Sequence, residues 1–206
     1  NELMEEAQYY TDECRKLFEL RMSLVPYLYS AFEEYQKTGL PPVSAVVMEY
    51  PQDEAARNLD DEYFFGKDLL VCPLTLEDGT SREVYLPEGN WYNFFTGEKI
   101  EGGRRLVLEA DWNEMLVFAR DGALVPVAEP VICVTEDTVF NITVKSFGTN
   151  KTGSCVLYED DFVSFNYESL VAKKQINVTV GDNGKFIVSG AKTSTKYHFL
   201  NCIVKD

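Results

Sequence analysis

Two acidic clusters hold the side chains best suited to chemistry, because carboxyl groups can act as nucleophiles, general acids or bases, and metal ligands. They are Asp60-Asp61-Glu62 and Glu159-Asp160-Asp161. Neighbours on a strand point to opposite faces, so adjacency in sequence does not make a working catalytic pair. We therefore expect turns, caps and solvated edges at both clusters, and we predict no metal site. A Ca²⁺ site at Glu159 to Asp161 is the alternative, since hard oxygen ligands occur there.

The other reactive side chains form no catalytic pattern. His198 is the single histidine, and it lies between Tyr197 and Phe199 without partners in a recognisable triad order, which predicts a structural role. Five cysteines without metal-ligand or redox spacing predict free and mostly buried thiols. They are Cys14, Cys72, Cys133, Cys155 and Cys202. The sequence has no glycine-rich phosphate loop and no zinc motif, so we predict no cofactor.

The segment Val84 to Gly97 concentrates aromatic side chains around a Pro/Gly turn and predicts a β-hairpin. Trp91 and Tyr92 are its weak candidates for substrate binding, because a flat apolar face with a polar edge suits stacking on a sugar ring. Trp112 and Tyr158 share this chemistry. The same residue types fill sandwich cores and seams between domains. We favour packing for all four, and the substrate-binding residues stay unknown.

Composition narrows the classes of partner. The chain has 206 residues and a formal net charge of −15. We exclude nucleic acid and membrane as expected partners, because phosphates and anionic lipids bind clustered Lys and Arg. No apolar run approaches the roughly 18 residues of a membrane span, and the polar segment Asn1 to Glu6 predicts no signal peptide. Sequons at Asn141, Asn150 and Asn177 would matter only in a eukaryotic secreted protein, so the localisation is unknown.

The elements that would position these residues begin with a helix. Apolar residues recur at steps of three and four from Glu2 to Lys37, with Pro26 expected to kink or break the helix and Thr38-Gly39 to end it. The nearly continuous apolar run Val43 to Tyr50 predicts a strand that is buried on both faces. Asp53 to Glu62 predicts a short polar helix with Asp53 as its cap. This helix and strand cannot bury all their apolar faces alone.

After Tyr63 the sequence alternates strand-like runs with Gly-, Asp- and Pro-containing turns, which predicts antiparallel sandwiches on either side of a linker at Pro126 to Pro130. The predicted strands before the linker are 68–74, 83–86, 91–95, 105–108, 115–119 and 124–127. Those after it are 131–135, 139–145, 154–158, 162–167, 173–180, 185–189 and 197–204, with a tight turn at 182–184.

The order of these motifs resembles glycoside hydrolase family 31, the α-glucosidases and α-xylosidases. The matching segments run from Leu17 to Tyr167 and include 24–30, 39–43, 49–53, 61–74, 82–87, 84–97, 120–126 and 157–161. Two positions depart from the family pattern. Ser44-Ala45 stand where many members have an arginine, and Phe162 stands where a glycine is usual. Each motif is weak alone, and the specificity lies in their shared order.

The resemblance implies a mainly β architecture. Residues 1–64 are similar to the last helix, buried strand and short helix of a (β/α)8 barrel. Residues 65–128 are similar to a proximal C-terminal β-sandwich domain, and residues 129–206 to a distal one. In such a region the β-domains buttress the barrel.

The resemblance also implies a function that these residues do not perform alone. The family consists of retaining α-glycosidases, which use two carboxyl groups. Neither aspartate motif matches any position here, so we predict no catalytic residue and no activity for this chain alone. The implied partners are an N-terminal catalytic barrel and, for the whole enzyme, an oligo- or polysaccharide. The alternatives are a carbohydrate-binding β-sandwich module and a structural module that self-associates through residues 1–64.

Overall fold

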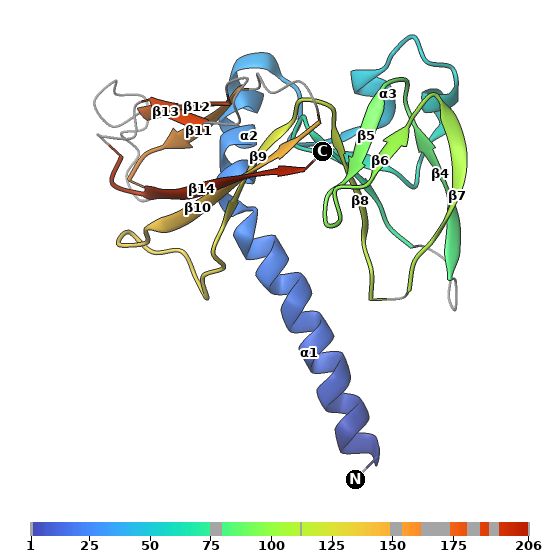
Figure 1. The fold of residues 1–206 in the computed structure, drawn as a ribbon, viewed down its shortest axis with the longest axis horizontal. Helices are drawn as coiled ribbons and strands as arrows, with labels where there is room; N and C mark the ends of the chain where they lie inside the picture. The colour runs from blue at the N-terminus through green and yellow to red at the C-terminus, as the bar shows by residue number, and fades with distance from the viewer. Residues whose placement is uncertain are drawn as a thin grey trace.

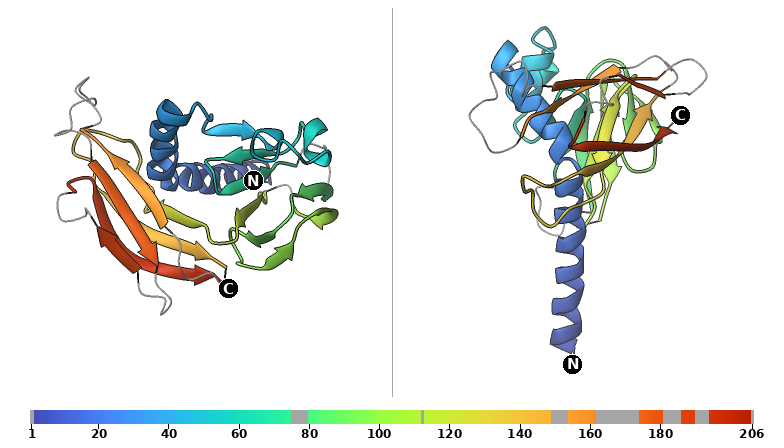
Figure 2. Two further views of the ribbon diagram at one scale, coloured as in Figure 1. Left: turned by 90° about the horizontal axis from the view of Figure 1, so that it is seen from above. Right: turned by 90° about the vertical axis from the view of Figure 1, so that its left-hand side faces the viewer.

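The computed structural model describes residues 2–74, 80–111, 113–148, 154–161, 174–180, 186–189 and 194–205. Two β-rich lobes lie side by side, and a long N-terminal helix runs away from them (Figure 1). The right-hand view of Figure 2 shows most of this helix standing clear of the lobes. None of the helices in the described ranges has the length and apolar content needed to cross a bilayer.

The segment predicted as one helix, Glu2 to Lys37, forms two helices in the structure. They are α1 (Glu2–Ser23) and α2 (Val25–Thr38), and Leu24 separates them with φ −94° and ψ 4°. The predicted break at Pro26 is confirmed. Pro26 lies in the first turn of α2, where a missing amide hydrogen leaves no helical bond unmade. Gly39 ends α2 in the left-handed conformation and donates its amide to the carbonyl of Tyr35.

The predicted strand over Val43 to Tyr50 is wrong beyond its first three residues. The structure has a strand β1 (Val43–Ala45) and then a helical turn α3 (Val46–Glu49). The turn closes because Tyr50 donates its amide to the carbonyl of Val46, and the Val46 side chain is thereby buried in the core. β1 alternates exposed, buried and exposed positions, so it is not buried on both faces.

The polar segment after α3 is helical only in the short 3₁₀ helix η1 (Ala55–Asn58). The Asp53 carboxylate accepts the amide of Ala55 at 2.9 Å, but Glu54 is the N-cap residue of η1, so Asp53 lies one position before the cap.

One lobe is an antiparallel sandwich. Its six-stranded sheet has the order β1-β2-β3-β8-β5-β6, and a second sheet pairs β4 with β7. The strands after β1 are β2 (Tyr63–Phe65), β3 (Leu69–Cys72), β4 (Ser81–Leu86), β5 (Asn90–Asn93), β6 (Lys99–Glu101), β7 (Arg104–Glu109) and β8 (Leu116–Arg120). A buried cluster that includes Phe64, Leu86, Trp91 and Phe118 fills the space between the two sheets.

The predicted hairpin over Val84 to Gly97 is wrong, because β4 and β5 belong to different sheets. The Pro87 to Gly89 turn carries the chain across the sandwich, and the Trp91 ring nitrogen donates to the carbonyl of Pro87 at 2.8 Å. β5 instead pairs with β6 and β8. The β5–β6 turn closes at Gly97, which has φ 85° and donates its amide to the carbonyl of Asn93.

The other lobe contains two three-stranded sheets of order β14-β10-β9 and β11-β12-β13. Its strands are β9 (Leu124–Ala128), β10 (Phe140–Phe147), β11 (Ser154–Glu159), β12 (Lys174–Val180), β13 (Phe186–Ser189) and β14 (Tyr197–Lys205). β10 and β14 are parallel, whereas the other pairs are antiparallel. The expected strand at Phe162 to Tyr167 and the turn at Asp182 to Gly184 lie outside the described residues.

Two predictions around the linker are wrong. Pro126 lies within β9, opposite Val144 of β10, because β9 is an outer strand on which a missing amide donor is tolerated. Val131 to Thr135 forms no strand, and a local turn holds it instead, in which Thr135 accepts the amide of Thr138 and Thr138 Oγ1 accepts the amide of Thr135.

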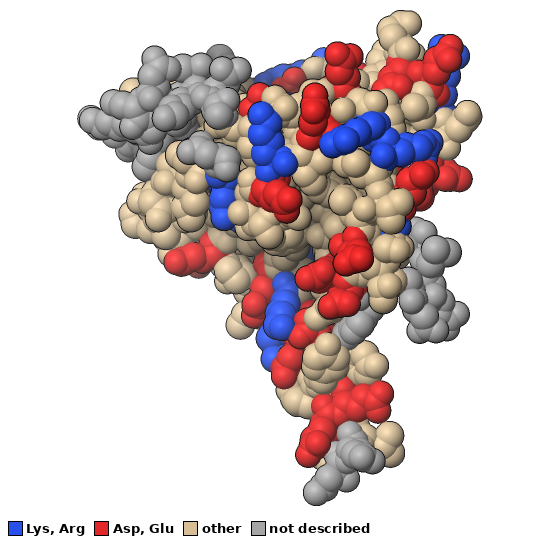
Figure 3. Space-filling view, turned by 45° about the vertical axis from the view of Figure 1, so that its right-hand side comes forward, with Lys and Arg blue, Asp and Glu red and all other residues tan. Residues whose placement is uncertain are grey.

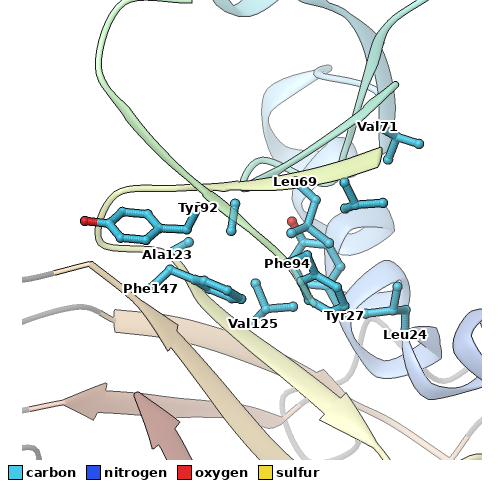
Figure 4. Packing of buried hydrophobic residues seen from close by; sticks show 11 residues of the cluster. Leu24, Tyr27, Leu69, Val71, Tyr92, Phe94, Ala123, Val125 and Phe147 are labelled. Carbon is cyan, nitrogen blue, oxygen red and sulfur yellow. The ribbon is translucent and has the colours of Figure 1, made fainter. Parts of the chain in front are cut away.

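A further buried cluster joins the helices to both lobes (Figure 4). Leu24 and Tyr27 come from the helices, Phe94 from the β5–β6 turn, and Val125 and Phe147 from β9 and β10. Alternate residues of β9 enter different cores, since Val125 belongs to this cluster and Leu124 to the core of the other lobe. The helices and lobes therefore share one continuous packing unit.

Candidate functional site: an uncovered helix face and strand edge

The N-terminal part of α1 carries apolar side chains that the rest of the structure leaves exposed. Leu3 is 82% exposed and Phe18 is 67% exposed. These two residues share a face with others at steps of three and four, where the side chains of a helix lie on one side. The stripe consists of Leu3, Ala7, Tyr10, Cys14 and Phe18. Figure 3 shows α1 projecting below the body, with uncharged, acidic and a few basic side chains on the visible face.

The outer edge of β1 is a second uncovered feature, separate from the stripe of α1. β1 is a terminal strand of its sheet and hydrogen-bonds only to β2 among the described strands. Val43 on this strand is half-exposed. A terminal strand presents backbone donors and acceptors that can pair with another chain segment. We define the stripe of α1 and the edge of β1 together as the uncovered surface.

A buried hydroxyl anchors the uncovered surface to the body. Tyr27 of α2 donates its hydroxyl to the carbonyl of Phe65 and accepts the amide of Asp68, both at 3.0 Å. Burial raises the pKa of this hydroxyl. The two bonds enclose Gly66, whose φ is +63°. Tyr27 thus fixes α2 against the turn that joins β2 to β3.

An arginine anchors α3 in the same way. Arg120 of β8 pairs with Glu49 at 2.8 Å, and its guanidinium lies 4.4 Å from the centroid of the Phe64 ring. Such a cation–aromatic contact strengthens when it is shielded from water. Nearby Asp68 has a raised pKa because burial outweighs the attraction of Lys67 and Arg120. Sequence analysis assigned no role to Tyr27 or Arg120, although both lie within motifs of the family resemblance.

The cluster Glu159 to Asp161 joins α2 to the lobe of β9 to β14. The hydroxyls of Tyr29 and Tyr158 both donate to Asp160, at 2.7 and 2.9 Å. Burial, followed by this carboxylate, raises the pKa of both hydroxyls. Glu159 is buried and accepts the amide of Thr195 at 3.0 Å. These carboxylates hold the fold together, and no group of three or more potential metal ligands occurs among the described residues.

The cluster Asp60 to Glu62 also makes structural contacts. Arg82 of β4 pairs with Asp61 at 2.7 Å and lies 3.5 Å from Glu62. Glu62 is buried and accepts the amide of Tyr85 at 2.7 Å. Burial raises the pKa of Glu62 to about 7, even though the Tyr85 amide and Arg82 oppose the shift. The solvated turn expected at Glu62 is therefore wrong, because β4 covers this carboxyl group.

Replacing Glu62 with glutamine should reduce the pH dependence of stability. A carboxyl whose pKa rises from 4.5 to about 7 on folding stabilises the protein fully below pH 4.5 and loses that contribution as pH rises through 7. The loss for the native residue is at most about 3–4 kcal/mol, because the pKa rises by about 2.5 and each pKa unit corresponds to about 1.4 kcal/mol. We expect urea unfolding at pH 5 and pH 8 to give a smaller difference for Glu62→Gln than for the native chain.

The matched control is Glu83→Gln on the same strand, since Glu83 is exposed and pairs with Arg105 at 2.9 Å. The control should keep the native pH dependence. Arg82, Asp61 and Cys72 face Glu62, and the buried Cys72 thiol has a pKa well above its usual range. An unchanged difference between pH 5 and pH 8 in Glu62→Gln would show that Glu62 does not titrate in this range.

The three aromatic candidates that the structure describes have no exposed face for a sugar. Trp91 is 1% exposed and Tyr92 is 0% exposed. Tyr158 is buried as well, and Trp112 lies outside the described residues. This burial favours packing over sugar stacking for the three described rings.

The histidine and the thiols have no reactive partners in the described structure. His198 Nδ1 lies 3.1 Å from the side-chain oxygen of Asn141 on the exposed face of the β14-β10-β9 sheet. All five cysteines are free, as predicted, but Cys14 and Cys133 are exposed and Cys202 is only partly buried. The prediction that the N-terminal helix cannot bury all its apolar faces alone is confirmed for α1, on which Leu3 and Phe18 are exposed.

These features define a mainly β region with an exposed apolar helix face and a terminal strand edge. Residues 39–125 match the glycosyl hydrolase family 31 C-terminal domain. The chain is 34% identical to α-glucosidase 2 of Bacillus thermoamyloliquefaciens over 85% of its own length and 22% of that protein. It is 32% identical to an α-xylosidase of Saccharolobus solfataricus, over 77% of this chain and 22% of the relative.

A solved family 31 dextranase from Flavobacterium johnsoniae has a similar fold. It superposes with a TM-score of 0.76 at 33% identity, over 86% of this chain and 22% of the dextranase. The chain belongs to glycoside hydrolase family 31, as a C-terminal region. It spans about a fifth to a quarter of the length of these relatives, each of which is a much longer protein.

Proposed function

We propose that this chain is the C-terminal support region of a retaining α-glycosidase that acts on α-glucosides or α-xylosides. Residues 1–64 would supply the last elements of a catalytic (β/α)8 barrel, and residues 65–128 and 129–206 would form most of the proximal and distal β-domains that buttress it. In the structure β1 and β2 pair within the first lobe, and β9 pairs within the second. The observation that carries this proposal is the uncovered surface. An apolar helix face and an open strand edge, both anchored to β-domains, are what a barrel needs at its closing elements.

The chemistry of such an enzyme would come from outside these residues. A retaining mechanism places two carboxyl groups about 5–5.5 Å apart across the glycosidic bond. The acidic clusters described above accept bonds from Arg82, Tyr85, Tyr29, Tyr158 and Thr195. Their present contacts are structural, so they do not offer such a pair. The substrates of the relatives, among them dextran and α-xylosides, indicate the class of substrate for the whole enzyme.

The test is hydrolysis of aryl α-glucosides and aryl α-xylosides. Residues 1–206 alone should show no turnover above a buffer blank, because they contain no catalytic carboxylate pair. The segment encoded upstream in the same gene should be inactive alone and gain activity when it is co-expressed with residues 1–206. Turnover by residues 1–206 alone, or full activity of the upstream segment alone, would refute the proposal.

The second candidate function of the uncovered surface is self-association through residues 1–64, because an exposed apolar patch can also bind a second copy of the chain. Sedimentation velocity of the isolated chain separates the two uses. A monomer over the micromolar range would exclude self-association while leaving the support role intact.

A further inference from the structure

A groove of about 680 Å³ lies between α1 and the loop Pro130 to Ile132, and neither Tyr27 nor Arg120 lines it. Tyr10, Cys14 and Phe18 form its helical wall, and the loop forms the opposite wall. The two walls are far apart in sequence, so only the tertiary fold creates the groove. The loop follows β9 directly and therefore belongs to the distal β-domain of the proposed architecture.

The walls of the groove are apolar and unusually exposed. The Ile132 side chain is fully exposed, and Phe18 is exposed by two thirds. Apolar area in contact with water is unfavourable relative to its burial, and contiguous patches of this kind mark interfaces. The rim is polar, since Arg15 and Glu19 border the groove. Arg15 pairs with Asp12 at 2.6 Å, so its charge is compensated within the helix.

We propose that this groove seats an apolar helix from the catalytic part of the same polypeptide. The distal β-domain would then contact the barrel directly through Ile132, in addition to its contact through the proximal domain. This inference rests on the proposed function. The helical form follows from the wall of α1, whose side chains at steps of three and four are spaced to receive the ridges of a second helix.

Two observations favour this occupant over a second copy of the chain. The curated relatives are much longer, since the chain spans 22% of the α-glucosidase, so they contain ample further polypeptide. In addition, α1 carries six acidic and three basic residues, and the whole chain has a net charge of −15. A second copy of α1 in the groove would bring like charges together, which is unfavourable.

Cys14 provides a reporter inside the groove, because its thiol is exposed in the isolated chain. The experiment measures the rate of maleimide labelling at Cys14 by peptide mass spectrometry, in a Cys133→Ser background. We expect labelling in the full-length enzyme to be at least tenfold slower than in residues 1–206, assayed at a concentration where the short chain sediments as a monomer. Equal rates would overturn the inference.

The loop wall is tested with Ile132→Glu in the full-length enzyme. This variant should restore fast labelling of Cys14 and lower the Tm by at least about 2–4 °C. In residues 1–206 the same change should leave the Tm unaltered, because Ile132 makes no buried contact there. The matched control is Val107→Glu, an exposed position on β7 far from the groove, which should change neither measurement.

The outcomes separate this inference from the support role. An active full-length enzyme that leaves Cys14 fully reactive refutes only the groove contact. An upstream segment that is fully active without residues 1–206 refutes the support role itself. Labelling in the short chain that slows as its concentration rises would assign the groove to a second copy and overturn the proposal.

Discussion

Replacing Phe94 with alanine should destabilise the fold by about 3–5 kcal/mol, the usual cost of removing a buried aromatic ring. Phe94 is 1% exposed in the cluster where the helices meet both lobes (Figure 4). Its ring stacks on Phe147 with centroids 5.8 Å apart, and the Lys145 ammonium lies 4.2 Å from its centroid. The substitution removes contacts from three parts of the structure at once, so the free energy of unfolding in urea should fall sharply.

The adjacent Phe95 is the matched control. It packs edge-on against Phe94 at 5.3 Å but is 41% exposed. Phe95→Ala should cost about 1–2 kcal/mol, clearly less than Phe94→Ala, since about two fifths of its side chain already faces water. If Phe94→Ala does not fold, Phe94→Leu should still fold with a smaller loss of about 1–2 kcal/mol. Equal losses at positions 94 and 95 would contradict a shared core at this point.

Gly66→Ala should be strongly destabilising, because the new methyl group would collide with the buried Tyr27 side chain. The backbone has φ +63° at this position, and an added Cβ would lie 2.3 Å from the Tyr27 hydroxyl oxygen. The left-handed conformation costs about 1–2 kcal/mol for an alanine. Displacing Tyr27 would also break two buried hydrogen bonds, each worth about 1 kcal/mol. We therefore expect a total loss of about 3 kcal/mol or more in urea unfolding.

Gly39→Ala isolates the backbone contribution, because Gly39 has φ +79° and no atom within 4 Å of an added Cβ. Its expected cost is only about 1–2 kcal/mol. A larger loss for Gly66→Ala than for Gly39→Ala would therefore measure the steric conflict with Tyr27. A difference of zero would mean that Tyr27 can move without cost, and the proposed anchor of α2 would fail.

Phe94 and Tyr27, the side chain that Gly66→Ala would displace, show how the helices and the two lobes stabilise one another. Phe94 and Tyr27 belong to one cluster, although they lie in a β-turn and in a helix. Tyr29 and Asp160 make a further link from α2 to the other lobe at 2.7 Å. Because α2 is fixed from two sides, residues 1–64 would present their uncovered surface in one orientation. Such a rigid presentation suits elements that complete a larger domain.

Residue types and their local order were sufficient to predict most of the helices and strands. Turn residues and alternating apolar positions placed strands such as β7 and β8 within one residue at either end. The break near Pro26 and the helix end at Gly39 follow from the chemistry of single residues, which acts over a few bonds. The ordered motifs also indicated the family, which the comparisons confirm.

Strand partners could not be predicted in this way. The segments β4 and β5 look like a hairpin in sequence, but the burial of Trp91 between the sheets separates them. The parallel pairing of β10 and β14 joins residues more than fifty positions apart. Val43 to Tyr50 reads as one strand, yet Val46 turns into the core and starts a helical turn.

The sequence alone determined many of the turns, most of the strands and the family to which the chain belongs, because these depend on residue type and order. Only the tertiary structure decided that Glu62 is buried, that Trp91 and Tyr92 have no exposed face, and that Ile132 lies opposite Phe18 across a groove. The physical reason is that burial and electrostatic environment depend on distant segments, whose approach is set by packing of the whole chain.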